Sequence, residues 1–173
     1  MRYHNLAHIA FNISDMEAAL NFYCGKLGLT RSFEMSFGTF YEKLKQDIAN
    51  NAVPPFIDGE TRLKELEPIR DRPWMVYLQA APGQFLELFY TYNEEPLLGD
   101  TSQKCGYQHM CLEVEDIHQA WNELTRKGVV PTTEITLGLD GSYQFWIADP
   151  DGNRIELMQY TDQSLQRIFG TEG

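Results

Sequence analysis

Four residues with metal-binding side chains occur at matching positions in two similar stretches of the sequence. His8 and His109 each lie in an apolar segment with an aspartate seven residues later, and Glu87 and Glu156 each follow a glycine by four residues. Imidazole nitrogens and carboxylate oxygens suit a divalent first-row ion such as nickel, cobalt, zinc, manganese or ferrous iron. If two similar halves pack about a pseudo-two-fold axis, equivalent residues converge. The spacing therefore predicts one metal ion held by all four side chains.

The similarity extends well beyond the four residues. LAHIAFNISDMEAALNFYCGKLGL at 6–29 matches YQHMCLEVEDIHQAWNELTRKGVV at 107–130, and GQFLELFY at 83–90 matches GNRIELMQY at 152–160. A single histidine or glutamate in a strand is usually an ordinary core or surface residue. Coincidence is a poor explanation for four such residues at equivalent positions of two similar segments. An internal duplication is the better interpretation.

Each half reads as a strand, a helix and three further strands. Apolar residues alternate with others over 6–13, which predicts a strand with His8 on its less apolar face. The same alternation in the second half predicts a strand with His109 on its less apolar face. Asp15 and Asp116 are helix-start signals, and Gly28 and Gly128 are stop signals. Further strands are predicted at 31–37, 74–80, 85–92, 131–137, 143–148 and 154–160.

These elements predict an α+β fold of two tandem βαβββ modules, at 1–98 and 99–173, that form one compact domain. About 35 residues, at about 38–73, interrupt only the first module, and their helical periodicity predicts a helical insert. Basic and aromatic residues in or near the insert suggest either an anion-binding wall or, as we favour, a solvated helix face; they are Tyr41, Lys43, Lys45, Arg62, Lys64, Arg70 and Arg72.

Composition excludes several classes of function. A formal net charge of −11 argues against nucleic acid or an anionic membrane as a partner. The sequence has no run of about 18 apolar residues that would span a membrane. Three cysteines, Cys24, Cys105 and Cys111, form no CxxC pair and indicate a reducing compartment, so we expect a cytoplasmic protein.

Two further motifs resemble a known family. FYCGKLGL at 22–29 and DPDGNRIEL at 149–157, together with the four spaced residues, closely resemble the vicinal oxygen chelate superfamily, which includes glyoxalase I, epimerases, extradiol dioxygenases and bleomycin resistance proteins. The resemblance covers 6–29 and 74–160. It implies a curved, cup-like mixed sheet of eight strands around the metal, a small-molecule substrate, and a homodimer.

The ligand set narrows the activity that the resemblance implies. Dioxygenases typically use two histidines and one glutamate, whereas the isomerase type adds a fourth ligand, which here is Glu87. The resemblance is therefore nearest to glyoxalase I-like lyases and related epimerases, which abstract a proton next to a carbonyl through a metal-stabilised enediolate. It implies Glu156 as the first choice of catalytic base and Glu87 as the second.

Alternative functions stay open at this point. They are an epimerase of a 2-substituted acyl or sugar-like substrate, an iron-dependent extradiol dioxygenase and a non-catalytic ligand-binding resistance protein. Glyoxalase I commonly has an arginine four residues after the first histidine, where it binds a carboxylate of glutathione. Asn12 stands there in this chain, and an amide forms no bidentate ion pair, so glutathione is not the expected substrate.

Overall fold

The computed structural model describes residues 6–91 and 107–170, which divide into two compact units. One unit contains 6–17 and 29–91, and the other contains 18–28 and 107–170. The second unit thus includes the helical segment that follows the first strand of the chain. No described helix has both the length and the apolar character needed to cross a membrane. The prediction of module boundaries at 98 and 99 falls outside the described residues.

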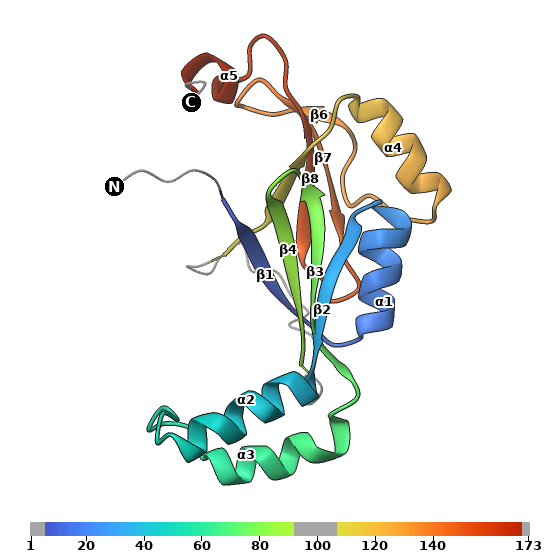
Figure 1. The fold of residues 1–173 in the computed structure, drawn as a ribbon. Coiled ribbons are helices and arrows are strands. Elements are labelled where there is room, and N and C mark those ends of the chain that lie inside the picture. Colours follow the sequence, from blue (N-terminus) through green and yellow to red (C-terminus); the bar gives the residue numbers. More distant parts are fainter. Residues whose placement is uncertain (1–5, 92–106, 171–173) are drawn as a thin grey trace. The chain divides into compact units, whose positions relative to one another are not determined.

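Each unit is built on a four-stranded mixed sheet, and the strand orders of the two sheets correspond (Figure 1). The first sheet has the order β1-β4-β3-β2, and its strands are β1 (His8–Ile13), β2 (Thr30–Ser36), β3 (Pro73–Ala81) and β4 (Gln84–Tyr90). The second has the order β5-β8-β7-β6, with β5 (Met110–Glu113), β6 (Thr136–Leu137), β7 (Tyr143–Ala148) and β8 (Arg154–Gln159). In both sheets the first strand is parallel to the last, and the other pairs are antiparallel. The predicted fold class is confirmed.

Helices connect these strands where the capping signals predict them. Helix α1 (Met16–Leu20) continues as a π-helical segment, η1 (Asn21–Lys26), and α4 (Ile117–Arg126) begins at Asp116, whose carboxylate accepts from two backbone amides. Gly28 and Gly128 follow with φ of 84° and 76°, a conformation that favours glycine. The short helix α5 (Leu165–Phe169) ends the described chain.

The strand faces also alternate as the sequence predicts. Phe11 and Ile13 of β1 are buried, whereas His8, Ala10 and Asn12 are exposed. In the second sheet Phe145 of β7 is fully buried and packs edge-on against Trp121 of α4, so this helix covers the apolar face. The opposite face of each sheet is left for the polar residues. The sequence overestimated one strand, because only Thr136 and Leu137 of the predicted 131–137 pair with a neighbour.

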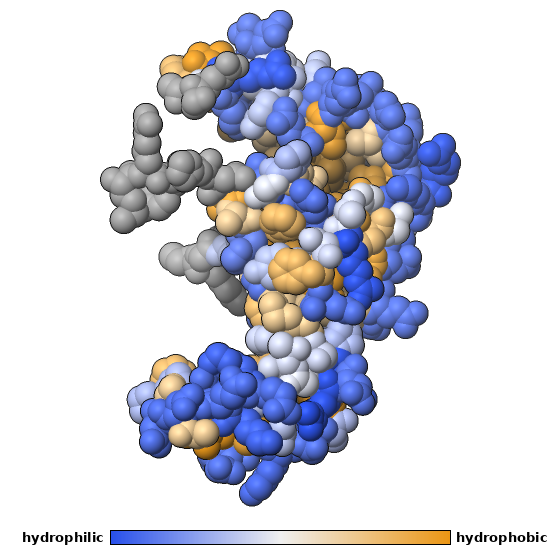
Figure 2. Space-filling view, viewed as in Figure 1, coloured by the Kyte–Doolittle hydropathy of each residue, from blue (hydrophilic) through white to orange (hydrophobic). Residues whose placement is uncertain are grey.

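The insert forms a helical hairpin with a core of its own. Helices α2 (Phe37–Ala49) and α3 (Gly59–Leu66), followed by a 3-10 turn, η2 (Glu67–Ile69), lie side by side beyond the ends of β2 and β3 (Figure 1). Their buried contacts come from Phe37, Leu44, Leu66 and Ile69. Hydrophilic side chains cover most of the face that Figure 2 shows. The predicted helical insert is thus confirmed.

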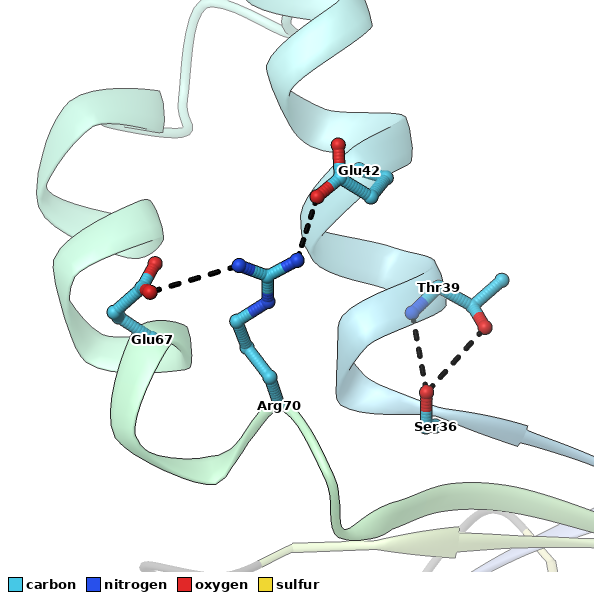
Figure 3. A network of polar contacts seen from close by, with 5 residues as sticks. All are labelled: Ser36, Thr39, Glu42, Glu67 and Arg70. Carbon is cyan, nitrogen blue, oxygen red and sulfur yellow. Dashed lines mark hydrogen bonds and ion pairs between the residues drawn. The ribbon is translucent and has the colours of Figure 1, made fainter.

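Arg70 links the two helices at the surface of the hairpin. Its guanidinium lies 2.6 Å from Glu42 on α2 and 3.6 Å from Glu67 on η2 (Figure 3). It also stacks 4.3 Å above the centroid of the Tyr41 ring. Arg62 pairs with Glu65, and Lys43 pairs with Asp47. These partners support the interpretation of the insert as a solvated, ion-paired helix surface.

Candidate metal-binding site

In each unit the structure brings one predicted histidine next to one predicted glutamate. His8 Nε2 lies 3.4 Å from Glu87 Oε2, and His109 Nε2 lies 3.2 Å from Glu156 Oε2. We call these the first and the second His–Glu pair. Both glutamates are buried, with 9% and 6% of their side chains exposed, whereas the histidines are 44% and 27% exposed. Each carboxylate is therefore held within the protein, and each imidazole reaches solvent.

Strand register produces the same geometry twice. In the parallel β1–β4 pair His8 lies opposite Phe85, and Glu87 is two residues further along β4 on the same face. In the β5–β8 pair Met110 lies opposite Ile155, so His109, one residue before β5, faces Arg154, two residues before Glu156. The matched sequence positions are thus matched in space, each across two neighbouring strands.

The spacing within each pair fits two ligands of one ion. Metal–donor bonds of about 2.1 Å separate neighbouring donor atoms by about 3.0 Å at right angles and by about 3.4 Å at tetrahedral angles. The observed separations of 3.2 and 3.4 Å fall in or close to this range. Across 6–91 and 107–170, no three histidine, cysteine, aspartate or glutamate side chains gather as a metal-binding group. The structure thus brings the four residues together two by two, and their convergence on one ion stays a prediction.

An aromatic side chain from the third strand borders each pair. Tyr77 lies opposite Glu87 in the register and edge-on to His8, with ring centroids 5.7 Å apart. Trp146 lies opposite Glu156 and edge-on to His109, with centroids 4.6 Å apart. The Nδ1 atom of His109 is buried with no hydrogen-bond partner among the described residues, so the contact with Trp146 and the strand itself hold this ring.

The pKa values of two groups beside the buried carboxylates are raised. Burial raises the pKa of Tyr77, and a hydrogen bond to Glu87 and the charge of Glu87 raise it further. In the second pair Cys111 lies opposite Glu156. Loss of solvent contact, followed by the charge of Glu156, raises the pKa of the Cys111 thiol to about 12, although part of the residue is exposed. Both groups therefore stay protonated at neutral pH.

Sequence reasoning did not indicate Tyr77 or Trp146 as residues of the site. The turn at 149–153 continues into a regular register that places Trp146 opposite Glu156, because a short turn fixes the register of its two strands. In the other hairpin the register shifts between Gln79 and Ala81, just before the turn at 82–83, and Tyr77 lies opposite Glu87 only because of this shift. The turns therefore carry a signal for Trp146 but not for Tyr77. Asn12 lies on the exposed face of β1 that also carries His8, as expected from the alternation.

Comparison with solved structures places this geometry in a common fold. A glyoxalase family protein from Enterococcus faecalis superposes with a TM-score of 0.63 at 21% identity, covering 91% of this chain and 99% of the other. A superfamily member from Sphaerobacter thermophilus gives 0.55 at 24%, covering 91% and 98%. A lactoylglutathione lyase from Agrobacterium tumefaciens gives 0.56 at 16%, covering 99% and 100%.

Sequence comparison gives the family directly. No curated protein sequence matches the chain at a significant level. The model of the Glyoxalase/Bleomycin resistance protein/Dioxygenase superfamily matches residues 5–157, which include both His–Glu pairs and both family motifs. This range covers most of the 173 residues. The chain therefore belongs to the Glyoxalase/Bleomycin resistance protein/Dioxygenase superfamily.

Proposed function

We propose that this protein is a divalent-metal-dependent lyase or isomerase of the glyoxalase I type, which moves a proton at a carbon next to a carbonyl group in a small molecule. The observation that carries the proposal is the presence of two His–Glu pairs in matching register. The distance from the histidine Nε2 to the glutamate Oε2 is 3.4 Å in the first pair and 3.2 Å in the second. A dioxygenase-type set of two histidines and one glutamate would leave Glu87 without a role. Here Glu87, like Glu156, is buried and lies beside a histidine.

The donor atoms of the pairs fit a divalent ion. Two neutral imidazoles and two carboxylates form an N2O2 set that balances a charge of two, and the set leaves positions for substrate oxygens in a six-coordinate ion. When bound, such an ion stabilises negative charge that develops on the substrate oxygens. Because the histidines are partly exposed, a small molecule from solvent can reach an ion bound to them. The glutamates are buried, which keeps their carboxylates fixed in position.

The neighbours of the two glutamates favour Glu156 as the proton acceptor. Glu87 faces the Tyr77 phenol across the register, and a phenol is a strong hydrogen-bond donor. Glu156 faces the Cys111 thiol instead, which is a weak donor. A carboxylate beside a strong donor is less available to receive a proton than one beside a weak donor. We therefore assign proton abstraction to Glu156, with Glu87 as the second candidate.

Proton exchange at substrate carbon tests this assignment. The metal-loaded protein is incubated in heavy water with a panel of α-hydroxy and α-keto compounds, and carbon-bound deuterium is measured by NMR. We expect exchange with the parent protein and a loss of at least about 100-fold in Glu156→Gln, since general-base catalysis contributes about 10²–10⁴-fold. Glu87→Gln should retain more of the exchange than Glu156→Gln does.

Glu113→Gln is the matched control, because Glu113 is an exposed carboxylate on β5, the strand that pairs with β8, and belongs to neither His–Glu pair. Its exchange should equal that of the parent protein. Parent-level exchange in Glu156→Gln would refute the assignment of the base, and a parent protein that binds no divalent metal would refute the proposed function as a whole. The homodimer and the cytoplasmic location stay predictions from the sequence.

A further inference from the structure

The two units differ in chemistry at one position beside the His–Glu pairs. Two residues before the glutamate, and on the same strand face, the first unit has Phe85 and the second has Arg154. In each unit this side chain contacts the aromatic residue that borders the pair. Phe85 packs edge-on to Tyr77 with centroids 6.1 Å apart, and Arg154 stacks over Trp146. The duplicated fold therefore places an apolar ring at one pair and a cation at the other.

The guanidinium of Arg154 is fixed close to the second pair. Its Cζ atom lies 4.5 Å from the centroid of the Trp146 ring, and the same ring is in edge contact with His109 at 4.6 Å. If the β5–β8 register is extended by one residue, Arg154 lies opposite His109, which immediately precedes β5. The cation, the indole and the imidazole thus form a continuous row on the face of the sheet that carries Glu156. Arg154 is only half-buried, so this cation reaches solvent.

Arg154 is not used in an ion pair with a described residue. Among the described residues, three other arginines have carboxylate partners: Arg31 pairs with Glu34, Arg62 with Glu65, and Arg70 with Glu42 and Glu67. For Arg154, the described residues supply an aromatic face instead of a carboxylate. Stacking uses the face of the guanidinium and leaves the N–H groups at its edge able to donate in its plane.

We propose that Arg154 is a specificity-determining residue that binds an oxyanion of the substrate, a carboxylate or a phosphate, next to the carbon that reacts. This inference rests on the proposed function and adds the substrate class, an anionic α-hydroxy or α-keto compound. A planar guanidinium recognises a carboxylate or phosphate through two parallel hydrogen bonds, which gives orientation as well as affinity. The stacked indole fixes the plane of the fork, so less side-chain entropy is lost when the anion binds.

Binding of a charged and a neutral probe of nearly equal shape tests the proposal. Mandelate and mandelamide are titrated by calorimetry into metal-free protein and into protein loaded with the metal that it binds most tightly. The parent protein should bind mandelate at least about 10-fold more tightly, and Arg154→Met should lose about 10- to 100-fold for mandelate with little change for mandelamide. Arg154→Lys, which keeps the charge without the fork, should fall between the two. Inorganic phosphate, as a third probe, tells whether the fork selects carboxylate or accepts both anions.

Arg167→Met is the matched control, because Arg167 also lies over an aromatic ring, that of Tyr160 at 5.8 Å, but lines a different pocket together with Glu113 and Glu115. It should bind both probes as the parent does. Thermal unfolding of each variant identifies loss of fold, and Arg154→Lys provides a second variant if Arg154→Met does not fold.

Two results would overturn the inference. The first is a parent protein that binds mandelate and mandelamide equally tightly, or binds neither. The second is a preference for mandelate over mandelamide that stays unchanged in Arg154→Met. Failure of the proposed function has a different signature. In that case the charge preference and its dependence on Arg154 persist in metal-free protein, while no metal binds and no deuterium enters carbon. If the protein binds metal and exchanges deuterium at carbon, but Arg154→Met does not change the preference for mandelate, this inference alone is rejected and the proposed function stands.

Discussion

The hydroxyl of Tyr23 donates a 2.8 Å hydrogen bond to the carboxylate of Asp149, across 126 residues of sequence. Tyr23 belongs to the first family motif, at 22–29, and Asp149 begins the second, at 149–157. Asp149 also accepts from the backbone amides of Asp151 and Asn153, and from the side-chain amide of Asn153. The helical segment 18–28 is thereby joined to the turn that precedes β8, and hence to the strand that carries Glu156.

Removing the hydroxyl of Tyr23 tests how much this link contributes to stability. Tyr23 is fully buried, and burial followed by the charge of Asp149 raises its pKa above the ordinary value, so it is a neutral donor at all moderate pH. Tyr23→Phe leaves a buried carboxylate oxygen with one donor fewer. We expect a loss of about 1–3 kcal/mol in the free energy of unfolding, measured by urea denaturation.

The control for this substitution is Tyr143→Phe, because Tyr143 is exposed on β7. It should change the free energy of unfolding by no more than about 0.5 kcal/mol. If both variants are equally stable, the hydrogen bond between Tyr23 and Asp149 contributes nothing measurable, and packing alone joins the segment to the turn.

A periodic pattern and a repeat together indicate the candidate site residues from the sequence. Alternation along 6–13 placed His8 on the polar face of a strand, and the repeat then located His109, Glu87 and Glu156 without knowledge of the register. The π-helical segment 21–26 was not predictable in this way, because an extra residue within a helical turn changes the hydrogen-bond pattern without a distinctive composition. The sequence likewise predicts Phe37 at the end of a strand, whereas it is the first residue of α2.

Residues that act through cross-strand neighbours are harder to predict than candidate metal ligands. Tyr77 and Arg154 belong to no ligand pattern, and their importance comes only from the register that sets them beside Glu87 and Trp146. A one-residue shift in either hairpin would turn these side chains to the opposite face. A sequence therefore indicates which residues hold a metal more readily than which residues surround it.

The core of the helical hairpin should be separable from the core of the sheet. Leu66 is fully buried among Phe37, Leu44 and Ile69, so Leu66→Ala removes apolar contacts and leaves a cavity, at a cost of about 2–5 kcal/mol. We expect amide hydrogen exchange in 37–69 to accelerate by at least about 10-fold, while exchange in β7 and β8 stays unchanged. Lys45→Ala, an exposed position on α2, should leave both regions as they are. Faster exchange in β7 and β8 would show instead that the hairpin and the second sheet unfold together.

The start of α3 should depend on pH. Asp58 is the N-cap residue, and hydrogen bonds from the Thr61 side chain and backbone lower the pKa of its carboxyl below the ordinary value. A carboxyl with a lowered pKa stabilises the folded state above its unfolded pKa, near 4, and this contribution is lost as pH falls through the folded value. Amide exchange in 59–66 should therefore accelerate relative to the rest of the chain below about pH 4. Asp58→Asn keeps an N-cap side chain that does not titrate, so the variant should lose this acid sensitivity. Retention of the same acid sensitivity in the variant would assign it to another group.

The two histidines should be about equally important for metal binding. If one ion is held by both pairs, each histidine supplies one of four protein donors, so His8→Gln and His109→Gln should each weaken zinc or nickel affinity by at least about 100-fold, judged against the 10- to 100-fold typical of residues that only support a ligand. The control is His118→Gln, because His118 is exposed on α4 and belongs to neither pair. Affinity is measured by competition with a chromophoric chelator, and stoichiometry by elemental analysis. One ion per chain in the parent, lost in both variants, is the expected result. Two ions per chain, or one ion that depends on a single histidine, would show that the pairs act independently, and the four-ligand site would have to be abandoned.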